Sequence, residues 1–231
     1  MKLSIVRTVA KLYPDILPHL SPRVRFLAAE PAEYKTIDYF VHQVELMVRH
    51  VYDGYMQSEF IDLMASLIQG QILQAVASCW NDEGTGGEMP DYLSEVAENM
   101  ILQQYDFVDG YYADIVSARE MEQGLDALLA RAALWGNRWN DAYNEAMRLI
   151  MAQLGGKLRW VFGDTEHCGT CQGLNGIVAY ASEWDELGVH PQGAPNDALE
   201  CGGWRCQCSL EPTEQRRSPK AFDTIMNVVN K

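Results

Sequence analysis

The sequence lacks several features that would assign it to a familiar class. Residues 1–12 are interrupted by Arg7 and Lys11 and show neither a clean apolar core nor a cleavage site, so we expect no signal peptide. No uninterrupted apolar run approaches the roughly 20 residues of a membrane-spanning helix. A Gly-rich phosphate loop, the HExxH motif and the H-x-E pattern of nucleobase deaminases are absent. We therefore expect a protein made in the cytoplasm, without a membrane partner and without catalytic activity.

Positive charge is also scarce. The 231 residues include 18 Lys and Arg against 32 Asp and Glu, which gives a net charge of −14. Residues 36–156 hold five basic and nineteen acidic side chains, whereas residues 1–35 hold six basic and three acidic ones. Because an acidic surface repels phosphate groups, direct nucleic-acid binding is not expected. Partners with basic or apolar surfaces suit this charge, and the N-terminus is the one candidate basic arm.

Proline content and hydrophobic periodicity divide the chain into four segments. Residues 1–31 contain four prolines, which predicts an extended arm with short helical turns. In residues 32–156 apolar side chains recur at helical spacing, with a loop at 81–90, which predicts a helical domain. Residues 157–212 shift to short strand patterns, and residues 213–231 form a polar, then weakly amphipathic tail. The predicted fold class is mainly α, with a small C-terminal β-hairpin module that resembles a zinc knuckle.

Five of the six cysteines gather within 41 positions of the third segment, at Cys168, Cys171, Cys201, Cys206 and Cys208. The first two form a CxxC between two strand candidates, residues 157–163 and 176–184, so a hairpin turn would carry them. Zinc takes four tetrahedral ligands and favours thiolates, and a reducing cytoplasm disfavours disulfides. We therefore predict a closed structural zinc site. Reduced thiols or disulfides remain the alternative if the mature protein meets oxidising surroundings.

The pattern leaves the ligand set open, because five cysteines are one too many for one tetrahedral ion. The second pair of ligands is either Cys201 with Cys206 or Cys206 with Cys208. His167 directly precedes Cys168 and would have difficulty reaching the same ion. The sixth cysteine, Cys79, is expected to be a small buried apolar residue.

These residues resemble the C-terminal signature of phage head morphogenesis proteins, the Mu F-like minor head proteins. The resemblance covers about residues 157–212 and includes the CxxC, the turn Leu174-Asn175-Gly176, a loop with Pro191 and Pro195, and the closing Cys206-Gln207-Cys208. The family often has His-Pro just before its Cys-x-Cys. This sequence has Cys201-Gly202-Gly203-Trp204-Arg205 there instead, so Cys201 is the natural substitute for that histidine.

The resemblance implies a structural component of a virion. Such a protein would dock near the portal during head assembly, with portal, capsid or neck proteins, or further copies of itself, as partners. We expect the arm and the tail to order against neighbouring subunits, and the zinc knuckle to fix the loops at 181–205 for a partner. An alternative is a zinc-dependent hydrolase or nuclease with a treble-clef-like module and a cleft lined by His167, His190 and acidic residues. A weaker alternative is a zinc-dependent binding module of a bacterial regulator.

Overall fold

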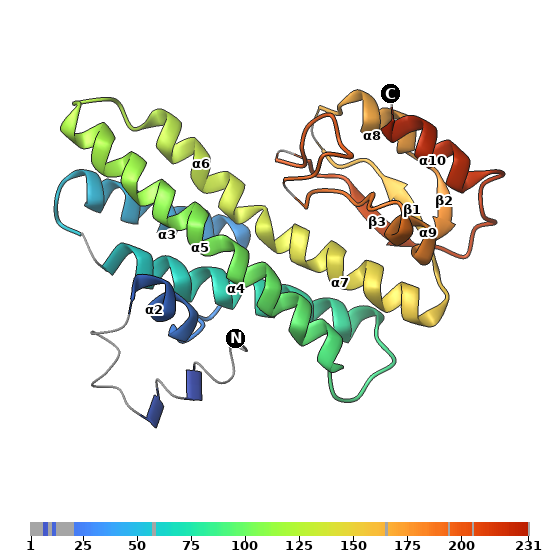
Figure 1. Cartoon of the computed structure of the whole chain (residues 1–231), viewed down its shortest axis with the longest axis horizontal. Coiled ribbons are helices and arrows are strands. Elements are labelled where there is room, and N and C mark those ends of the chain that lie inside the picture. The colour runs from blue at the N-terminus through green and yellow to red at the C-terminus, as the bar shows by residue number, and fades with distance from the viewer. Residues whose placement is uncertain are drawn as a thin grey trace. The chain divides into compact units, whose positions relative to one another are not determined.

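The computed structural model describes residues 7–8, 11–12, 21–56, 59–164, 166–193, 195–204 and 206–230 (Figure 1). Its described part is mostly helical, with a small antiparallel sheet near the C-terminus, which confirms the predicted fold class. The elements are α2 (Pro22–Ala28), α3 (Ile37–Tyr52), α4 (Glu59–Glu83), α5 (Asp91–Glu120), α6 (Asp126–Gly136), α7 (Arg138–Leu154), β1 (Lys157–Val161), α8 (Gly169–Leu174), β2 (Val178–Tyr180), α9 (Ala181–Glu186), β3 (Ser209–Pro212) and α10 (Ala221–Val229).

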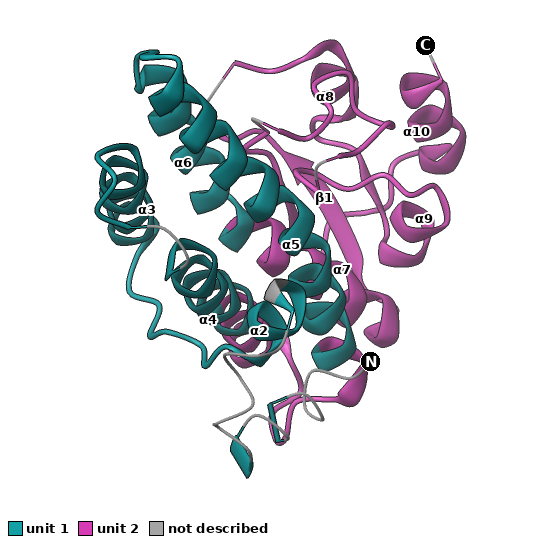
Figure 2. Ribbon diagram, turned by 60° about the vertical axis from the view of Figure 1, so that its left-hand side comes forward, with its two compact units in different colours: residues 1–74, 94–139 teal, residues 75–93, 140–231 magenta. Residues whose placement is uncertain are grey.

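The chain forms two compact units, which Figure 2 colours separately. Unit 1 comprises residues 1–74 and 94–139, and unit 2 comprises residues 75–93 and 140–231. The C-terminal cysteines therefore share a unit with the end of α4 and most of α7. The division of the chain into four segments stays a prediction.

Unit 1 has an apolar core of mostly aliphatic side chains, which also includes several aromatic rings. The helical spacing predicted for residues 32–156 is confirmed in α3, where Phe40, Val44, Met47, Val48 and Val51 are all buried. The α3 helix begins at Ile37, later than the predicted start of the helical domain at residue 32, because the Thr36 hydroxyl caps it by accepting a hydrogen bond from the Tyr39 N–H. A row of rings from Phe60 through Tyr111 to Trp135 joins α4, α5 and α6. Helical periodicity thus predicted the helix α3 and the face that it buries.

The described end of the N-terminal arm is a helix that is anchored on this core. Residues 22–28 form α2, and Phe26 is fully buried. The side chain of Gln69 donates a hydrogen bond to the Phe26 carbonyl, and the Ala32 N–H donates to the Ser66 carbonyl. The expected short helical turn is thus present at residues 22–28, and this part of the arm orders on α4 of its own chain. Ordering of the arm against a neighbouring subunit stays a prediction. The remainder of the predicted arm lies largely outside the described residues.

Helix α4 is long and apolar enough, by length and composition, to cross a membrane, although polar residues interrupt its apolar sequence. Sixty-one per cent of its most apolar window is buried within the protein. Burial of this kind is also found in the core helix of a protein that meets no membrane. Cys79 lies in this helix and is fully buried, as expected of a small apolar residue, and burial raises the pKa of its thiol to about 12.

The sheet of unit 2 has the strand order β2-β1-β3, with both pairs antiparallel. β1 and β2 are the predicted hairpin, and α8 lies in their connection. The predicted second strand is too long, because residues 181–186 form α9. The Glu183 side chain accepts a hydrogen bond from the Tyr180 N–H at the start of that helix, which favours a helical turn. The indoles of Trp160 and Trp184 are fully buried in this unit, with ring centroids 5.8 Å apart.

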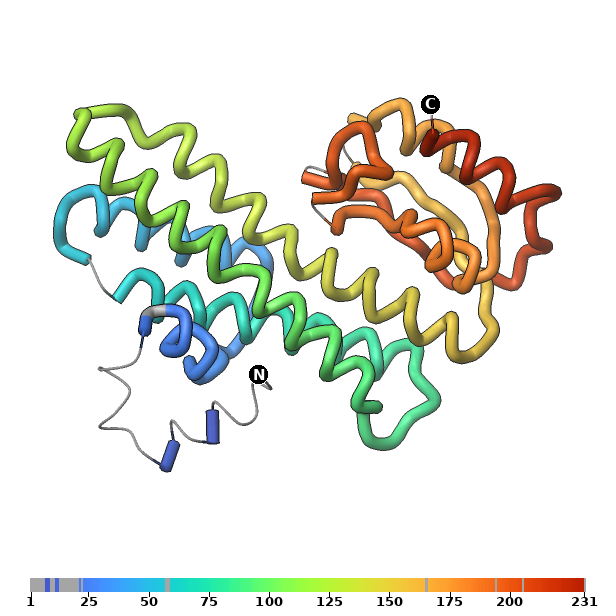
Figure 3. Tube along the Cα trace, in the orientation of Figure 1, coloured from blue at the N-terminus to red at the C-terminus, as the bar shows by residue number. Residues whose placement is uncertain are grey.

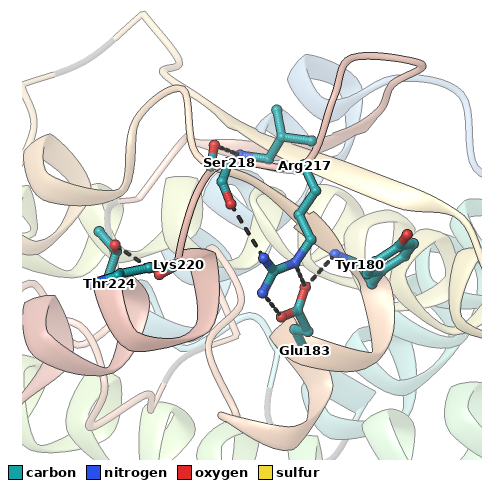
Figure 4. Close-up of polar contacts among 7 residues, drawn as sticks. Tyr180, Glu183, Arg217, Ser218, Lys220 and Thr224 are labelled. Carbon is teal, nitrogen blue, oxygen red and sulfur yellow. Dashed lines mark hydrogen bonds and ion pairs between the residues drawn. The ribbon is translucent and has the colours of Figure 1, made fainter.

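The C-terminal tail docks on the sheet module of its own chain, as the end of the tube in Figure 3 shows. Arg217 forms a bidentate ion pair with Glu183 of α9 (Figure 4). The Ser218 N–H donates to the Val178 carbonyl at 2.8 Å. Helix α10 then packs against α8, with Ile225 fully buried. Residues 217–225 of the tail therefore order on their own chain, whereas Met226 of α10 is 38% exposed. Ordering of the tail against a neighbouring subunit stays a prediction.

Candidate metal centre

Two of the clustered cysteines are held by the short helix α8. Cys168 is its N-cap residue and Cys171 lies one turn later, so both project from one side of the helix. The helix ends at the predicted Asn-Gly turn, where Gly176 has a φ of +79° that a side chain would strain. The Gly176 N–H donates to the Trp160 carbonyl at 2.9 Å, which ties the turn to β1. The CxxC is thus fixed by the hairpin that flanks it.

Cys206 and Cys208 lie in extended chain immediately before β3. Alternate residues of an extended segment project to the same side, so both thiols are buried while Gln207 between them is exposed. Gly163, after β1, lets this segment approach closely. A Cβ atom there would lie 2.1 Å from the Gln207 carbonyl oxygen.

Cys201 belongs to the loop just before Cys206, where this sequence departs from the family pattern. Gly202 and Gly203 follow it with φ of +61° and +78°, and they turn the chain sharply. Two hydrogen bonds join this loop to α8. The Gly169 N–H donates to the Glu200 carboxylate at 2.7 Å, and the Glu200 N–H donates to the Thr170 hydroxyl at 3.1 Å. Cys201 is therefore held beside Cys168.

The fold brings all five predicted cysteines together as two groups of three. In one group the sulfurs of Cys171, Cys206 and Cys208 lie within 4.8 Å of one another, and in the other those of Cys168, Cys171 and Cys201 do so. Cys171 belongs to both. Its sulfur is 3.9 Å from that of Cys206, and a tetrahedral zinc site with Zn–S bonds of about 2.3 Å has sulfur–sulfur edges of about 3.8 Å. These cysteines could hold a metal ion.

Backbone N–H groups surround the sulfurs with hydrogen-bond donors. Cys168 interacts with the N–H groups of Cys171 and Cys201, Cys201 with that of Gly203, and Cys206 with that of Gln192. The N–H of Gly163 interacts with Cys208. Such donors stabilise thiolates, the form of cysteine that binds metals. The sequence pattern did not reveal Gly163 or Gln192, because a loop glycine and a loop glutamine have many other roles.

Crowding gives the five thiols different pKa values. Contacts with Cys171 and Cys206 lower the pKa of Cys208 to about 3, whereas contacts with Cys206 and Cys208 raise the pKa of Cys171. Burial raises the pKa of Cys201 to about 11. Burial also opposes ionisation of Cys168, but its N–H donors outweigh this and lower its pKa. Neighbouring thiolates repel one another, so a bound cation is what would let four of them ionise together.

The surroundings of the cluster also fit a thiolate-bound ion. The Trp160 indole N–H is buried without a hydrogen-bond partner of normal length, and it interacts with the Cys208 sulfur, whose pKa it helps to lower. Gln192 is 3% exposed, and its side-chain amide donates to the Cys208 carbonyl at 3.2 Å. Donors of this kind around the ligands orient them and tune a metal site.

The two nearby histidines occupy different places. The Nδ1 atom of His167 is 3.7 Å from the Cys208 sulfur, and its ring stacks on Phe162. His167 therefore lies beside the group that contains Cys208. His190 lies against the backbone of Gly193. Among the described residues, the groups of side chains able to hold a metal consist of cysteines alone.

All six cysteines are free thiols in the structure. Comparison of the chain with protein-family models, with curated proteins and with solved structures finds no significant match. The resemblance to phage head morphogenesis proteins thus stays a prediction from the residues quoted for it.

Proposed function

We propose that this chain is a structural minor head or neck protein of a tailed bacteriophage or prophage, which docks near the portal during head assembly. The observation that carries the proposal is the convergence of five cysteines, from two stretches of the family-like signature, on one cluster. In this proposal Cys168, Cys171, Cys201, Cys206 and Cys208 supply the four ligands of a structural zinc ion. Bound zinc would hold the loops around α8 and β3 in one conformation.

Zinc is the metal that this donor set favours. Thiolates select soft or borderline ions, and zinc binds them without redox chemistry of its own. The cluster offers more sulfurs than one ion needs, and three of them are nearly inaccessible, with exposed fractions of 2%, 5% and 1% for Cys171, Cys206 and Cys208. A closed site of this kind suits a structural ion. Catalytic zinc keeps one position open for water or substrate and relies on a nearby general base.

Docking to other virion proteins fits the charge of the helical region. With a strong acidic excess in residues 36–156, it would associate with basic or apolar surfaces and not with packaged DNA. The N-terminal segment, which carries the opposite charge, would contact an acidic face of the portal or of a neighbouring copy.

Purified phage particles test the proposal directly. Particles induced from the host that encodes this chain should contain its peptides by mass spectrometry, in a fraction that sediments with DNA-filled heads. Deletion of residues 1–20 should leave a folded, soluble protein, because the described anchor begins at α2, but one that fails to enter particles. A chain that stays outside the particles, or a truncated chain that enters them normally, would contradict the proposal.

The alternative of a zinc-dependent hydrolase or nuclease is tested with the same material. Purified zinc-loaded protein should not cleave DNA, RNA or ester substrates. Cleavage that is lost on substitution of His167 or His190, with zinc still bound, would establish the enzyme instead.

A further inference from the structure

The cluster has one thiol more than a tetrahedral ion requires, and the structure indicates which thiols compete. Cys171, Cys206 and Cys208 form the buried group of three. Cys171 is positioned by α8, and the other two by the extended segment that leads into β3, so these three sulfurs are held by the sheet module. We take them as the constant ligands.

Cys168 and Cys201 both lie beside this buried group, next to Cys171. Each sulfur lies within 4.8 Å of Cys171 and of the other, and neither joins Cys206 and Cys208 in a group of three. Both residues are partly exposed, in contrast to the constant ligands. The hydrogen bonds that Glu200 makes with Gly169 and Thr170 hold their two segments side by side. A small movement of either thiol toward the buried group would complete four ligands.

We propose that Cys168 and Cys201 share the fourth ligand position and form an oxidisable pair whose conversion to a disulfide releases the ion. This inference rests on the zinc site of the proposed function. With zinc bound, one of the two remains a partly exposed thiol beside the site. Such a thiol can react with peroxide, whereas the three constant ligands are shielded.

The reaction balances with hydrogen peroxide as the oxidant. The free thiolate of the pair attacks one peroxide oxygen, the O–O bond breaks, and a sulfenic acid and hydroxide form. The second sulfur of the pair then attacks the sulfenic sulfur, the S–S bond forms, and a second hydroxide leaves. Protons from the thiol and from solvent convert both hydroxides to water. The two sulfurs together lose two electrons, the peroxide gains them, and the site is left with three cysteine ligands.

This chemistry would couple the module to its surroundings. In a reducing cytoplasm, where heads assemble, the pair stays reduced and zinc holds the loops. In oxidising surroundings after release of the phage, the disulfide would join the loop of Cys201 to the N-terminus of α8. A covalent link would then replace the ion at the same place in the fold.

The test follows zinc release from the full-length, zinc-loaded protein with a colorimetric zinc chelator while hydrogen peroxide is added. Wild-type protein should release its zinc as two thiols are lost, and mass spectrometry of unreduced peptides should find a Cys168–Cys201 disulfide. The single variants Cys168→Ser and Cys201→Ser should each bind zinc when reduced and retain it at the peroxide dose that empties the wild type. The double variant should lose zinc to the chelator without oxidant. Cys79→Ala, outside the cluster, is the matched control and should behave as wild type.

The possible results separate this inference from the proposed function. Loss of zinc binding in reduced Cys168→Ser but not in Cys201→Ser would make Cys168 a constant ligand and refute the sharing. Zinc that binds but resists peroxide, or a disulfide between other cysteines, would refute the oxidisable pair while the structural zinc site stands. Reduced wild-type protein that binds no zinc would overturn both.

Discussion

Removal of Cys171 should damage the C-terminal module more than removal of any other clustered cysteine. Cys171 is the one thiol that belongs to both groups of three. Its loss leaves two separate pairs, and among the described residues no three of the remaining thiols lie within 4.8 Å of one another. Loss of Cys168 or Cys201 leaves the buried group intact. Cys171→Ser should therefore abolish tight zinc binding, although four cysteines remain.

The size of the effect follows from the energy that a structural ion supplies. Zinc contributes on the order of 10 kcal/mol to the folding of small modules at neutral pH, and whole domains are stable by about 5–15 kcal/mol. The loss of zinc is thus large enough to open the cysteine-bearing loops. A buried serine hydroxyl without a partner would add only about 1–3 kcal/mol, so Cys171→Ala, which lacks that hydroxyl, should show nearly the same defect.

Hydrogen exchange with mass spectrometry, in zinc-containing buffer, measures where the variant opens. Peptides from residues 163–176 and 195–208 should lose their protection, while those from α3 and from residues 94–120 of α5 should keep theirs. Circular dichroism should retain most of the helical signal. Equal or milder loss in Cys171→Ser than in Cys168→Ser would refute the shared role of Cys171. Loss of protection in α3 and α5 would show that unit 1 depends on the module.

Three further results are expected. Purified reduced protein should hold one zinc ion per chain by elemental analysis and show six titratable thiols under denaturant, whereas no metal together with two disulfides would contradict the site. Gly163→Ala should weaken zinc binding, because the added Cβ would lie 2.1 Å from the Gln207 carbonyl oxygen. Denaturant unfolding should show a loss of about 1–3 kcal/mol of stability. Unchanged zinc affinity would argue against this close approach. Glu183→Gln should cost about 1–2 kcal/mol and expose α10 to exchange. The hydrogen bond from Arg217 lowers the pKa of Glu183. The ion pair therefore stabilises the tail above the ordinary carboxyl pKa, and this stabilisation is lost as the pH falls through the lowered value. If hydrogen-exchange protection of the tail is unchanged by both the substitution and acid, the stabilising role of this ion pair is refuted.

Local pattern predicted the parts of the fold in which one face of a regular element is buried. Phe40, Val44 and Val51 identified the inner face of α3 because helical spacing places them in one row. Gly155, with its φ of +66°, ends α7 where the sequence predicted. The same reasoning failed at residues 181–184, which the predicted strand included but which form the start of α9. There the Glu183 carboxylate accepts hydrogen bonds from the Tyr180 N–H and from Arg217. Arg217 is 34 positions away, so a pattern read over a few neighbouring residues could not include it.

The candidate site was predicted in part. Cysteine spacing alone indicated a metal cluster, because CxxC and Cys-x-Cys each place two sulfurs on one side of a turn or an extended segment. It did not indicate that Gly163, Gln192 and Trp160 would supply donors to the sulfurs. Nor did it indicate that the tail from Arg217 onward would cover α8. These contacts join residues that are distant in the chain. Glycine, glutamine, tryptophan and arginine occur in many settings, so their presence in the sequence does not reveal such a role.

By itself the sequence determined the helical body, the start of the C-terminal hairpin and the concentration of thiol ligands in one segment, because periodicity, glycine positions and cysteine spacing act over a few residues. Only the tertiary structure decided how the five thiols are grouped. The antiparallel pairing of β1 with β2 and β3 brings α8 to the segment of Cys206 and Cys208, and the contacts of Glu200 with α8 bring Cys201 to Cys168. Cys171 belongs to both groups because the segment of Cys206 and Cys208 and the loop of Cys201 both come close to it. Distances across strand pairs and loops are set by packing and hydrogen bonds between remote residues, so spacing along the chain could not reveal them.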